Sequence, residues 1–117
     1  IVRGGRNSDF LFGGTDDDSL FGGAGRDTRH GETGDDDLIG GGAADRFIFA
    51  SVDGDDRVLD FANDIDTLDV TEFGLTRQAL RDAAAQVGDD VVLTFLPDTT
   101  LTVLDIRVGA LLDDVLT

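Results

Sequence analysis

Aspartate recurs at a fixed interval through the first part of the chain. The in-phase carboxylates are nine residues apart, at Asp9, Asp18, Asp27, Asp36 and Asp45. Glycine follows the same period, at Gly4, Gly13, Gly22, Gly31 and Gly40. A short carboxylate held in a turn is a ligand for a hard cation, and glycine permits the tight turns that present it. The pattern therefore predicts a row of turns that bind something cationic.

Acidic residues dominate the charge of the chain. It has 117 residues, with 25 acidic side chains against nine basic ones, and a formal net charge of −16. A nucleic acid or an anionic membrane surface would need a basic patch, so the composition argues against both as partners. No stretch approaches eighteen consecutive apolar residues, which excludes a membrane-spanning helix. The absence of Cys excludes disulfides and thiolate metal sites.

The nine-residue repeat runs without a break over residues 1–48. Cut at its glycines, the chain reads GGRNSDFLF, GGTDDDSLF, GGAGRDTRH, GETGDDDLI and GGGAADRFI. A flexible linker would not hold Gly, Asp and an apolar residue in phase over five copies. The period is also too short for helical repeats. The sequence therefore predicts a β-solenoid, in which position eight of each copy faces inward and Arg29 replaces an apolar residue in the third copy.

These nonapeptides resemble the Ca²⁺-binding repeat G-G-x-G-x-D-x-U-x of RTX (repeats-in-toxin) proteins. The resemblance implies an all-β fold: a parallel β-roll in which each copy is a six-residue loop and a three-residue strand. Two copies would complete one turn of 18 residues, so that loops from alternate copies stack on each edge. The copies depart from the motif at Glu32 in position two and at Asn7, Asp16 and Ala43 in position four. Arg29 is expected to reach the roll edge or to pair with a nearby Asp.

The family resemblance also implies three or more Ca²⁺ sites between stacked loops, where backbone carbonyls supplement the position-six carboxylates. The first site would join Gly5, Asn7 and Asp9 with Gly22, Ala24 and Asp27. The second would join Gly23, Gly25 and Asp27 with Gly40, Gly42 and Asp45. The third, on the opposite edge, would join Gly14, Asp16 and Asp18 with Gly31, Thr33 and Asp36. Parallel strands ~4.8 Å apart would place an ion ~2.4 Å from each loop level, a distance that suits Ca²⁺.

The repeats offer only one inward side chain per nonapeptide, so their predicted core is thin. Such a core cannot offset the entropy of ordering the loops, and the crowded carboxylates repel one another. We therefore expect residues 1–48 to fold only when cations are bound.

Residues 49–117 lack the period and are expected to form a β-rich segment with one short helix that caps the roll. We expect strands at 57–61 and 67–70, a helix at 77–87 with Thr76 as its N-cap, and a hairpin of 90–96 with 100–106 around Pro97 and Asp98. This segment resembles the one that closes the roll in secreted RTX proteins such as serralysin-type proteases, on the residues 45–49, 56–61 and 66–70. The cluster Asp53, Asp55 and Asp56 is either a solvated loop or part of one more site against Glu32, Gly34 and Asp36.

The chain shows no H-E-x-x-H or G-x-S-x-G motif and contains no Cys, Lys or Tyr, so a catalytic role is not expected. The resemblance implies a calcium-binding module of a larger secreted bacterial protein, whether or not that parent is an enzyme such as a metalloprotease. The module would fold outside the cell and stabilise the attached domain, and its partners would be that upstream domain and the type I secretion apparatus. Residues 114–117 fit either the secretion signal or the last strand of the cap. The alternative is an adhesion or carbohydrate-binding module like those of alginate epimerases, against which the net charge argues.

Overall fold

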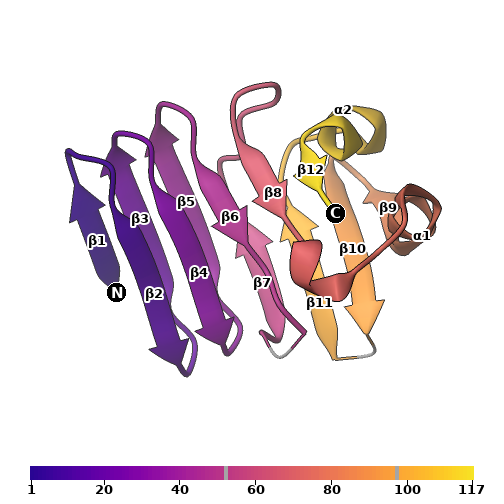
Figure 1. Cartoon of the computed structure of the whole chain (residues 1–117), viewed down its shortest axis with the longest axis horizontal. Coiled ribbons are helices and arrows are strands. Elements are labelled where there is room, and N and C mark those ends of the chain that lie inside the picture. Colours follow the sequence, from indigo (N-terminus) through magenta and orange to yellow (C-terminus); the bar gives the residue numbers. More distant parts are fainter. Residues whose placement is uncertain (52, 97) are drawn as a thin grey trace.

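Two parallel sheets that face each other make up most of the molecule in this computed structural model, which describes residues 1–51, 53–96 and 98–117 (Figure 1). The first sheet contains β1 (Val2–Gly5), β3 (Ser19–Ala24), β5 (Asp37–Gly42) and β7 (Asp55–Val58). The second contains β2 (Phe10–Thr15), β4 (Thr28–Thr33), β6 (Arg46–Ile48) and β8 (Thr67–Asp69). The chain alternates between the two sheets, which confirms the predicted parallel β-roll.

The register of the strands confirms that one turn of the roll contains two nonapeptides. Leu20 pairs with both Val2 and Leu38, and Arg29 pairs with both Leu11 and Phe47. The prediction of a six-residue loop and a three-residue strand is wrong, because β2 to β5 are each six residues long. In β2 to β5, the strand continues through the first three residues of the next copy, because their glycine-rich backbone also pairs with the neighbouring coil.

The core lies between the two sheets and is formed by the inward residues of each strand. At position eight, Leu11, Leu20, Leu38 and Phe47 are buried, as the sequence predicts, whereas Phe10 and Phe12 on the outer face are exposed. Both sheets continue past residue 48, where Val58 and Leu68 add to the same core. The division into repeats at 1–48 and a cap at 49–117 stays a prediction.

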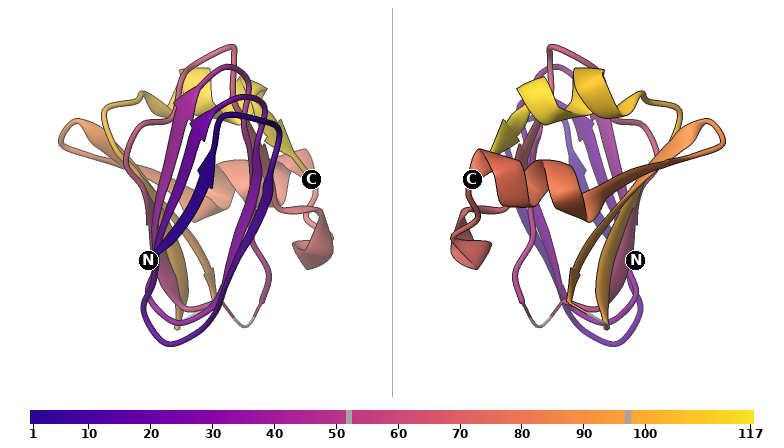
Figure 2. Two further views of the ribbon diagram at one scale, coloured as in Figure 1. Left: turned by 90° about the vertical axis from the view of Figure 1, so that its left-hand side faces the viewer. Right: turned by 90° about the vertical axis from the view of Figure 1, so that its right-hand side faces the viewer.

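The last part of the chain covers one end of the roll. The strands β9 (Ala84–Val87), β10 (Asp90–Leu96) and β11 (Thr99–Val103) extend the first sheet, and β12 (Val115–Leu116) extends the second. The antiparallel pairing of β10 and β11 confirms the predicted hairpin, although Pro97 in its turn lies outside the described residues. Figure 2 shows the helices gathered at this end, with β1 at the other.

The helical segments are short. They are η1 (Thr71–Phe73), α1 (Arg77–Ala83) and α2 (Val108–Asp113). The hydroxyl of Thr76 accepts a hydrogen bond from the Ala79 N–H, which confirms this residue as the N-cap of α1. The prediction that this helix extends to residue 87 is wrong, because Ala84–Val87 pairs with β10 and tertiary pairing overrides the helix propensity of Ala. Among the described residues, none of these helices is long and apolar enough to cross a membrane.

Candidate metal sites

The in-phase aspartates form a hydrogen-bonded ladder along each edge of the roll. On one edge, the backbone N–H of Asp9 donates to Asp27 Oδ1 at 2.8 Å, and the N–H of Asp27 donates to Asp45 Oδ1 at 2.9 Å. On the other edge, the N–H of Asp18 donates to Asp36 Oδ1 at 2.7 Å. The predicted division of the five aspartates between two edges is therefore confirmed. Each bond fixes one carboxylate oxygen; the second oxygen is unpartnered in Asp36 and Asp45, whereas that of Asp27 contacts Arg29.

Three of the in-phase aspartates have a second carboxylate oxygen that is buried and could bind a cation. The Oδ2 atoms of Asp9, Asp36 and Asp45 are buried and have no hydrogen-bond partner among the described residues. An unpaired buried acceptor costs roughly 1–3 kcal/mol, and more when it is charged. Each oxygen points at the position-one glycine of its own copy, where an added Cβ would collide with it; for example, a Cβ on Gly40 would lie 2.5 Å from Asp45 Oδ2. Because glycine has no side chain, the space beside each of these oxygens is not filled by a Cβ atom.

Backbone carbonyls from the next coil converge on the same places. Beside Gly4, a Cβ would lie 2.8 Å from Asp9 Oδ2 and 2.7 Å from the Gly22 carbonyl oxygen. Beside Gly13, it would lie 3.2 Å from Asp18 Oδ2 and 2.5 Å from the Gly31 oxygen. The structure therefore brings together oxygens from both loops of the first and of the third predicted site, which fits Ca²⁺ as an oxygen-seeking cation.

The other predicted residues of these loops line the same stacked turns. The carbonyls of Gly5 and Asn7 face Gly23 and Gly25 of the next coil, and that of Asp16 faces Gly34. The carbonyl of Gly14 accepts a bond of 3.3 Å from the Thr33 hydroxyl. Ala24 pairs in register with Gly42. In the described residues, no three His, Cys, Asp or Glu side chains form a metal cluster, so these candidate sites depend on the carbonyls.

Three of the residues that depart from the repeat motif adopt the left-handed backbone conformation that favours glycine. Glu32 at position two has a φ of 70°, and Asp16 and Ala43 at position four have φ of 74° and 76°. Glycine adopts this left-handed region at no steric cost, whereas other residues are strained in it. These departures therefore preserve the shape of the loops and add strain.

Two aspartates beyond the repeats extend the ladders. Asp56 Oδ1 accepts the N–H of Asp36, and Asp66 Oδ1 accepts the N–H of Asp45, both at 2.9 Å. The spacings of 20 and 21 residues break the nine-residue period, so Asp66 was not among the predicted site residues. A sequence pattern that could have identified both ladder residues is an Asp two positions before a buried apolar residue. It occurs at Asp56 with Val58 and at Asp66 with Leu68.

The cluster that the sequence left open divides into three environments. Asp56 joins the ladder, and Asp55 is exposed and binds the Thr100 hydroxyl at 2.8 Å. Asp53 is buried; its Oδ2 accepts the Ala50 N–H at 2.6 Å and contacts His30 Nε2 at 2.9 Å. This contact raises the pKa of His30, although burial acts in the opposite direction.

Crowding and burial change the acidity of the ladder carboxyls. Burial is the main reason why the pKa values of Asp36, Asp45 and Asp66 lie above the usual range, and it raises the pKa of Asp56 to about 8. Neighbouring aspartates add to these rises by repulsion. The loops therefore favour protons or another cation beside these oxygens.

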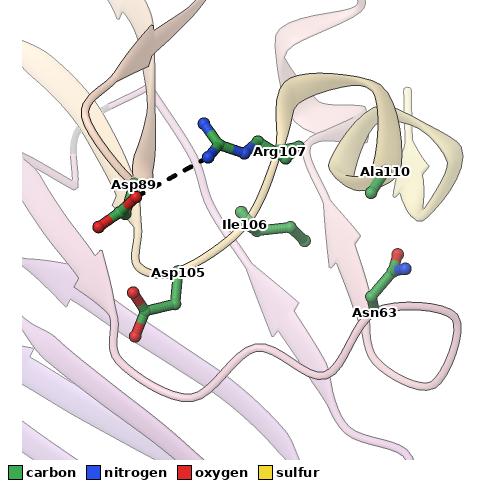
Figure 3. Close-up of a pocket in the computed structure, with 6 residues that line it drawn as sticks. All are labelled: Asn63, Asp89, Asp105, Ile106, Arg107 and Ala110. Atoms are coloured by element: carbon green, nitrogen blue, oxygen red, sulfur yellow. Dashed lines mark ion pairs between the residues drawn. The ribbon is translucent and has the colours of Figure 1, made fainter.

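The pocket in Figure 3 is lined by residues that follow the repeats, and it lies apart from the repeat loops. Its lining residues are Asn63, Asp89, Asp105, Ile106, Arg107 and Ala110. The charged groups facing each other there, Asp89 and Arg107, are an exposed ion pair 3.8 Å apart. An exposed ion pair of this kind contributes little to the stability of the fold. None of the residues that line this pocket belongs to the aspartate ladders.

Comparison with known proteins agrees with this geometry. A family model described as the RTX calcium-binding nonapeptide repeat (four copies) matches residues 1–28 and 30–51. The extracellular lipase LipA from Serratia marcescens is similar in structure, with a TM-score of 0.61 and 28% identity over 97% of this chain. The chain spans only 20% of that lipase.

A second solved structure is the AlgE6R3 subunit of the mannuronan C5-epimerase from Azotobacter vinelandii. It has a TM-score of 0.40 and 24% identity over 97% of this chain and 80% of its own. No curated protein matches the chain. The family match coincides with the stacked, in-phase loops, and residues 1–28 and 30–51 of this chain therefore carry RTX calcium-binding nonapeptide repeats.

Proposed function

We propose that the chain is a non-catalytic calcium-binding module of a larger secreted bacterial protein, whose repeats fold as their loops bind Ca²⁺. The observation that carries this proposal is the set of buried, unpartnered Oδ2 atoms of Asp9, Asp36 and Asp45. Bound Ca²⁺ would supply the positive charge that these oxygens and the facing carbonyls lack. Without it, their desolvation and mutual repulsion oppose the stacking of the coils.

Three or more ions fit the arrangement of the loops. The first predicted site is supported by the convergence of Asp9 Oδ2 with the Gly22 carbonyl, and the third by that of Asp18 Oδ2 with the Gly31 carbonyl. Asp36 and Asp45 each have a further free oxygen next to the loops that contain Asp56 and Asp66. These two levels are candidates for additional ions on the two edges.

Coupling of folding to Ca²⁺ would suit passage through a type I secretion apparatus. Inside the cell, where free Ca²⁺ is scarce, the acidic repeats would stay unfolded because no ion offsets their repulsion. Outside, filled sites would shift the equilibrium to the folded roll. The similarity to a lipase described as extracellular supports this location.

The open end of the roll supports a stabilising role toward an upstream domain. β1 and β2 are the edge strands of the two sheets at the N-terminal end, whereas β9 to β12 and the helices cover the opposite end (Figure 1). An uncovered strand edge invites pairing with another segment. We propose that the preceding part of the parent protein covers β1 and β2, so that deletion of this module lowers the thermal unfolding midpoint of that upstream domain in Ca²⁺.

Circular dichroism during a Ca²⁺ titration tests the calcium-dependent folding directly. The unsubstituted 117-residue chain, used below as the parent of each variant, should gain its β-sheet signal as Ca²⁺ is added and lose it when a chelator is added. Asp36→Asn should raise the Ca²⁺ midpoint, whereas Asp113→Asn, which removes the same charge from an exposed residue of α2, should leave it unchanged. A full β-sheet signal in excess chelator would overturn the proposal.

A further inference from the structure

Arg29 is a fully buried cation at the level of the second predicted site. Its side chain projects inward from β4 and has an exposed fraction of 0%. The Nη2 atom donates a hydrogen bond of 2.6 Å to the Gly40 carbonyl oxygen. The same nitrogen lies 3.3 Å from Asp27 Oδ2 and 3.4 Å from Asp45 Oδ1. One guanidinium nitrogen thus contacts three oxygens from two stacked loops, and each oxygen belongs to a residue of that predicted site.

The equivalent level one turn earlier has no such cation. Leu11 pairs in register with Arg29 and cannot supply a charge. Beside Gly4, Asp9 Oδ2 and the Gly22 carbonyl converge, and Asp9 Oδ2 has no partner in the described part of the chain. Beside Gly22, which follows 18 residues later, the corresponding place is taken by the Arg29 guanidinium next to Asp27 Oδ2. The two levels have the same carboxylate, carbonyl and glycine, and they differ in the residue at position eight.

The guanidinium is held in this place by its surroundings. The Phe47 ring, which follows Arg29 in the same inward row, lies 5.0 Å from the guanidinium carbon. A guanidinium over an aromatic face is attracted by the ring. Nε and Nη1 have no hydrogen-bond partner among the described residues, so the polar contacts of this side chain are concentrated at Nη2.

We infer that Arg29 takes the place of Ca²⁺ between the Asp27 and Asp45 loops, so that this level of the roll binds no metal ion. A second cation within a few ångströms of the guanidinium would be repelled by it, and three of the oxygens it needs are already engaged. The residues predicted for the second site, Gly23, Gly25, Asp27, Gly40, Gly42 and Asp45, would then surround an arginine. This inference rests on the proposed calcium-binding function, and it lowers by one the number of ions on this edge.

The substitution Arg29→Leu tests the inference because Leu stands at position eight of three other copies. Isothermal titration calorimetry of the whole chain should show one more Ca²⁺ bound per Arg29→Leu molecule than per parent molecule. The control Arg26→Leu removes the same charge from an exposed position of the same loop, and its ion count should equal that of the parent. An equal count in Arg29→Leu and the parent would overturn the inference.

A crystal structure of the parent chain grown with Ca²⁺ gives an answer that does not depend on how the variant folds. Anomalous density should mark an ion beside Asp9 Oδ2, and the Arg29 guanidinium should remain beside Asp27 Oδ2. An ion bound to Asp27 Oδ2 and the Gly40 carbonyl would overturn the inference and leave the proposed function intact. A parent chain that bound no Ca²⁺ at all would overturn the proposed function and this inference with it.

Discussion

Asp27 Oδ1 accepts the backbone N–H of Asp9 at 2.8 Å, across the 18 residues that form one turn of the roll. The second oxygen of the same carboxylate lies 3.3 Å from Arg29 Nη2. One side chain therefore connects two coils and also neutralises a buried cation. Asp9, at the first level of the same edge, accepts no such N–H in the described residues, and its Oδ2 is unpartnered.

This difference predicts that Asp27→Ala weakens the roll more than Asp9→Ala. Removal of Asp27 leaves the Arg29 charge buried beside one remaining carboxylate, and breaking a buried ion pair in this way costs about 3–5 kcal/mol. Asp9→Ala removes a carboxylate oxygen that has no hydrogen-bond partner among the described residues, and it affects the first predicted Ca²⁺ site alone. Urea unfolding in saturating Ca²⁺ measures both free energies of unfolding, and the Ca²⁺ midpoint for folding should also rise more in Asp27→Ala. Equal midpoints for the two variants would contradict the assigned role of Asp27.

A second prediction concerns the glycines that face the free carboxylate oxygens. An added Cβ on Gly31 would collide with Asp36 Oδ2, whereas one on Gly42 meets no atom within 4 Å. We expect Gly31→Ala to destabilise the Ca²⁺-bound roll by roughly 1–3 kcal/mol, as overpacking does. Gly42→Ala, the matched control, should be neutral or should stabilise by a few tenths of a kcal/mol through the unfolded chain. Thermal unfolding in Ca²⁺ compares the two, and equal destabilisation would argue against a crowded, ligand-bearing loop at Gly31.

A third prediction concerns pH in the absence of Ca²⁺. Because burial raises the pKa of Asp56 to about 8 from the usual 3.8, the ion-free folded state binds a proton that the unfolded chain releases. This contribution is fully present below the unfolded pKa of 3.8 and is lost as the pH rises toward 8. Asp36, Asp45 and Asp66 shift in the same direction. The chelated chain should therefore have more β-sheet signal at pH 5 than at pH 8.

The pH dependence should reverse when Ca²⁺ is present, since protons and Ca²⁺ compete for the same carboxylates. The Ca²⁺ midpoint for folding should then rise as the pH falls from 8 to 5. Asp56→Asn should reduce the pH dependence of the chelated chain, because it removes the group with the pKa of about 8. An unchanged pH profile in this variant would show that another group is responsible.

The repeat made the roll predictable, because its period indicates a β-solenoid and its resemblance to RTX nonapeptides implies two copies per turn. With that 18-residue turn, the edge of each in-phase aspartate follows from its number; these residues are Asp9, Asp18, Asp27, Asp36 and Asp45. Thr76 could be recognised as an N-cap from local chemistry, and the structure places its hydroxyl on the Ala79 N–H. These features depend on local or periodic information that a single sequence contains.

Other features depend on contacts that spacing does not encode. Asp66 joins the ladder at 21 residues from Asp45, after an irregular loop that no period describes. The end of α1 at Ala83 is set by the pairing of β9 with β10, whereas the local sequence favours a longer helix. The sequence predicts that Arg29 reaches the roll edge or pairs with an aspartate. Its hydrogen bond to the Gly40 carbonyl depends on how neighbouring coils stack, which residue spacing does not encode.

Amide hydrogen exchange with and without Ca²⁺ tests most directly whether the repeats depend on bound ions for their fold. The N–H groups of Asp9, Asp18, Asp27 and Asp36 each donate to the aspartate one turn ahead, so their exchange reports the stacking of the coils residue by residue. We predict strong protection of these amides in Ca²⁺ and exchange close to the unfolded rate in chelator at pH 8. Equal protection of these amides in the two conditions would contradict the account.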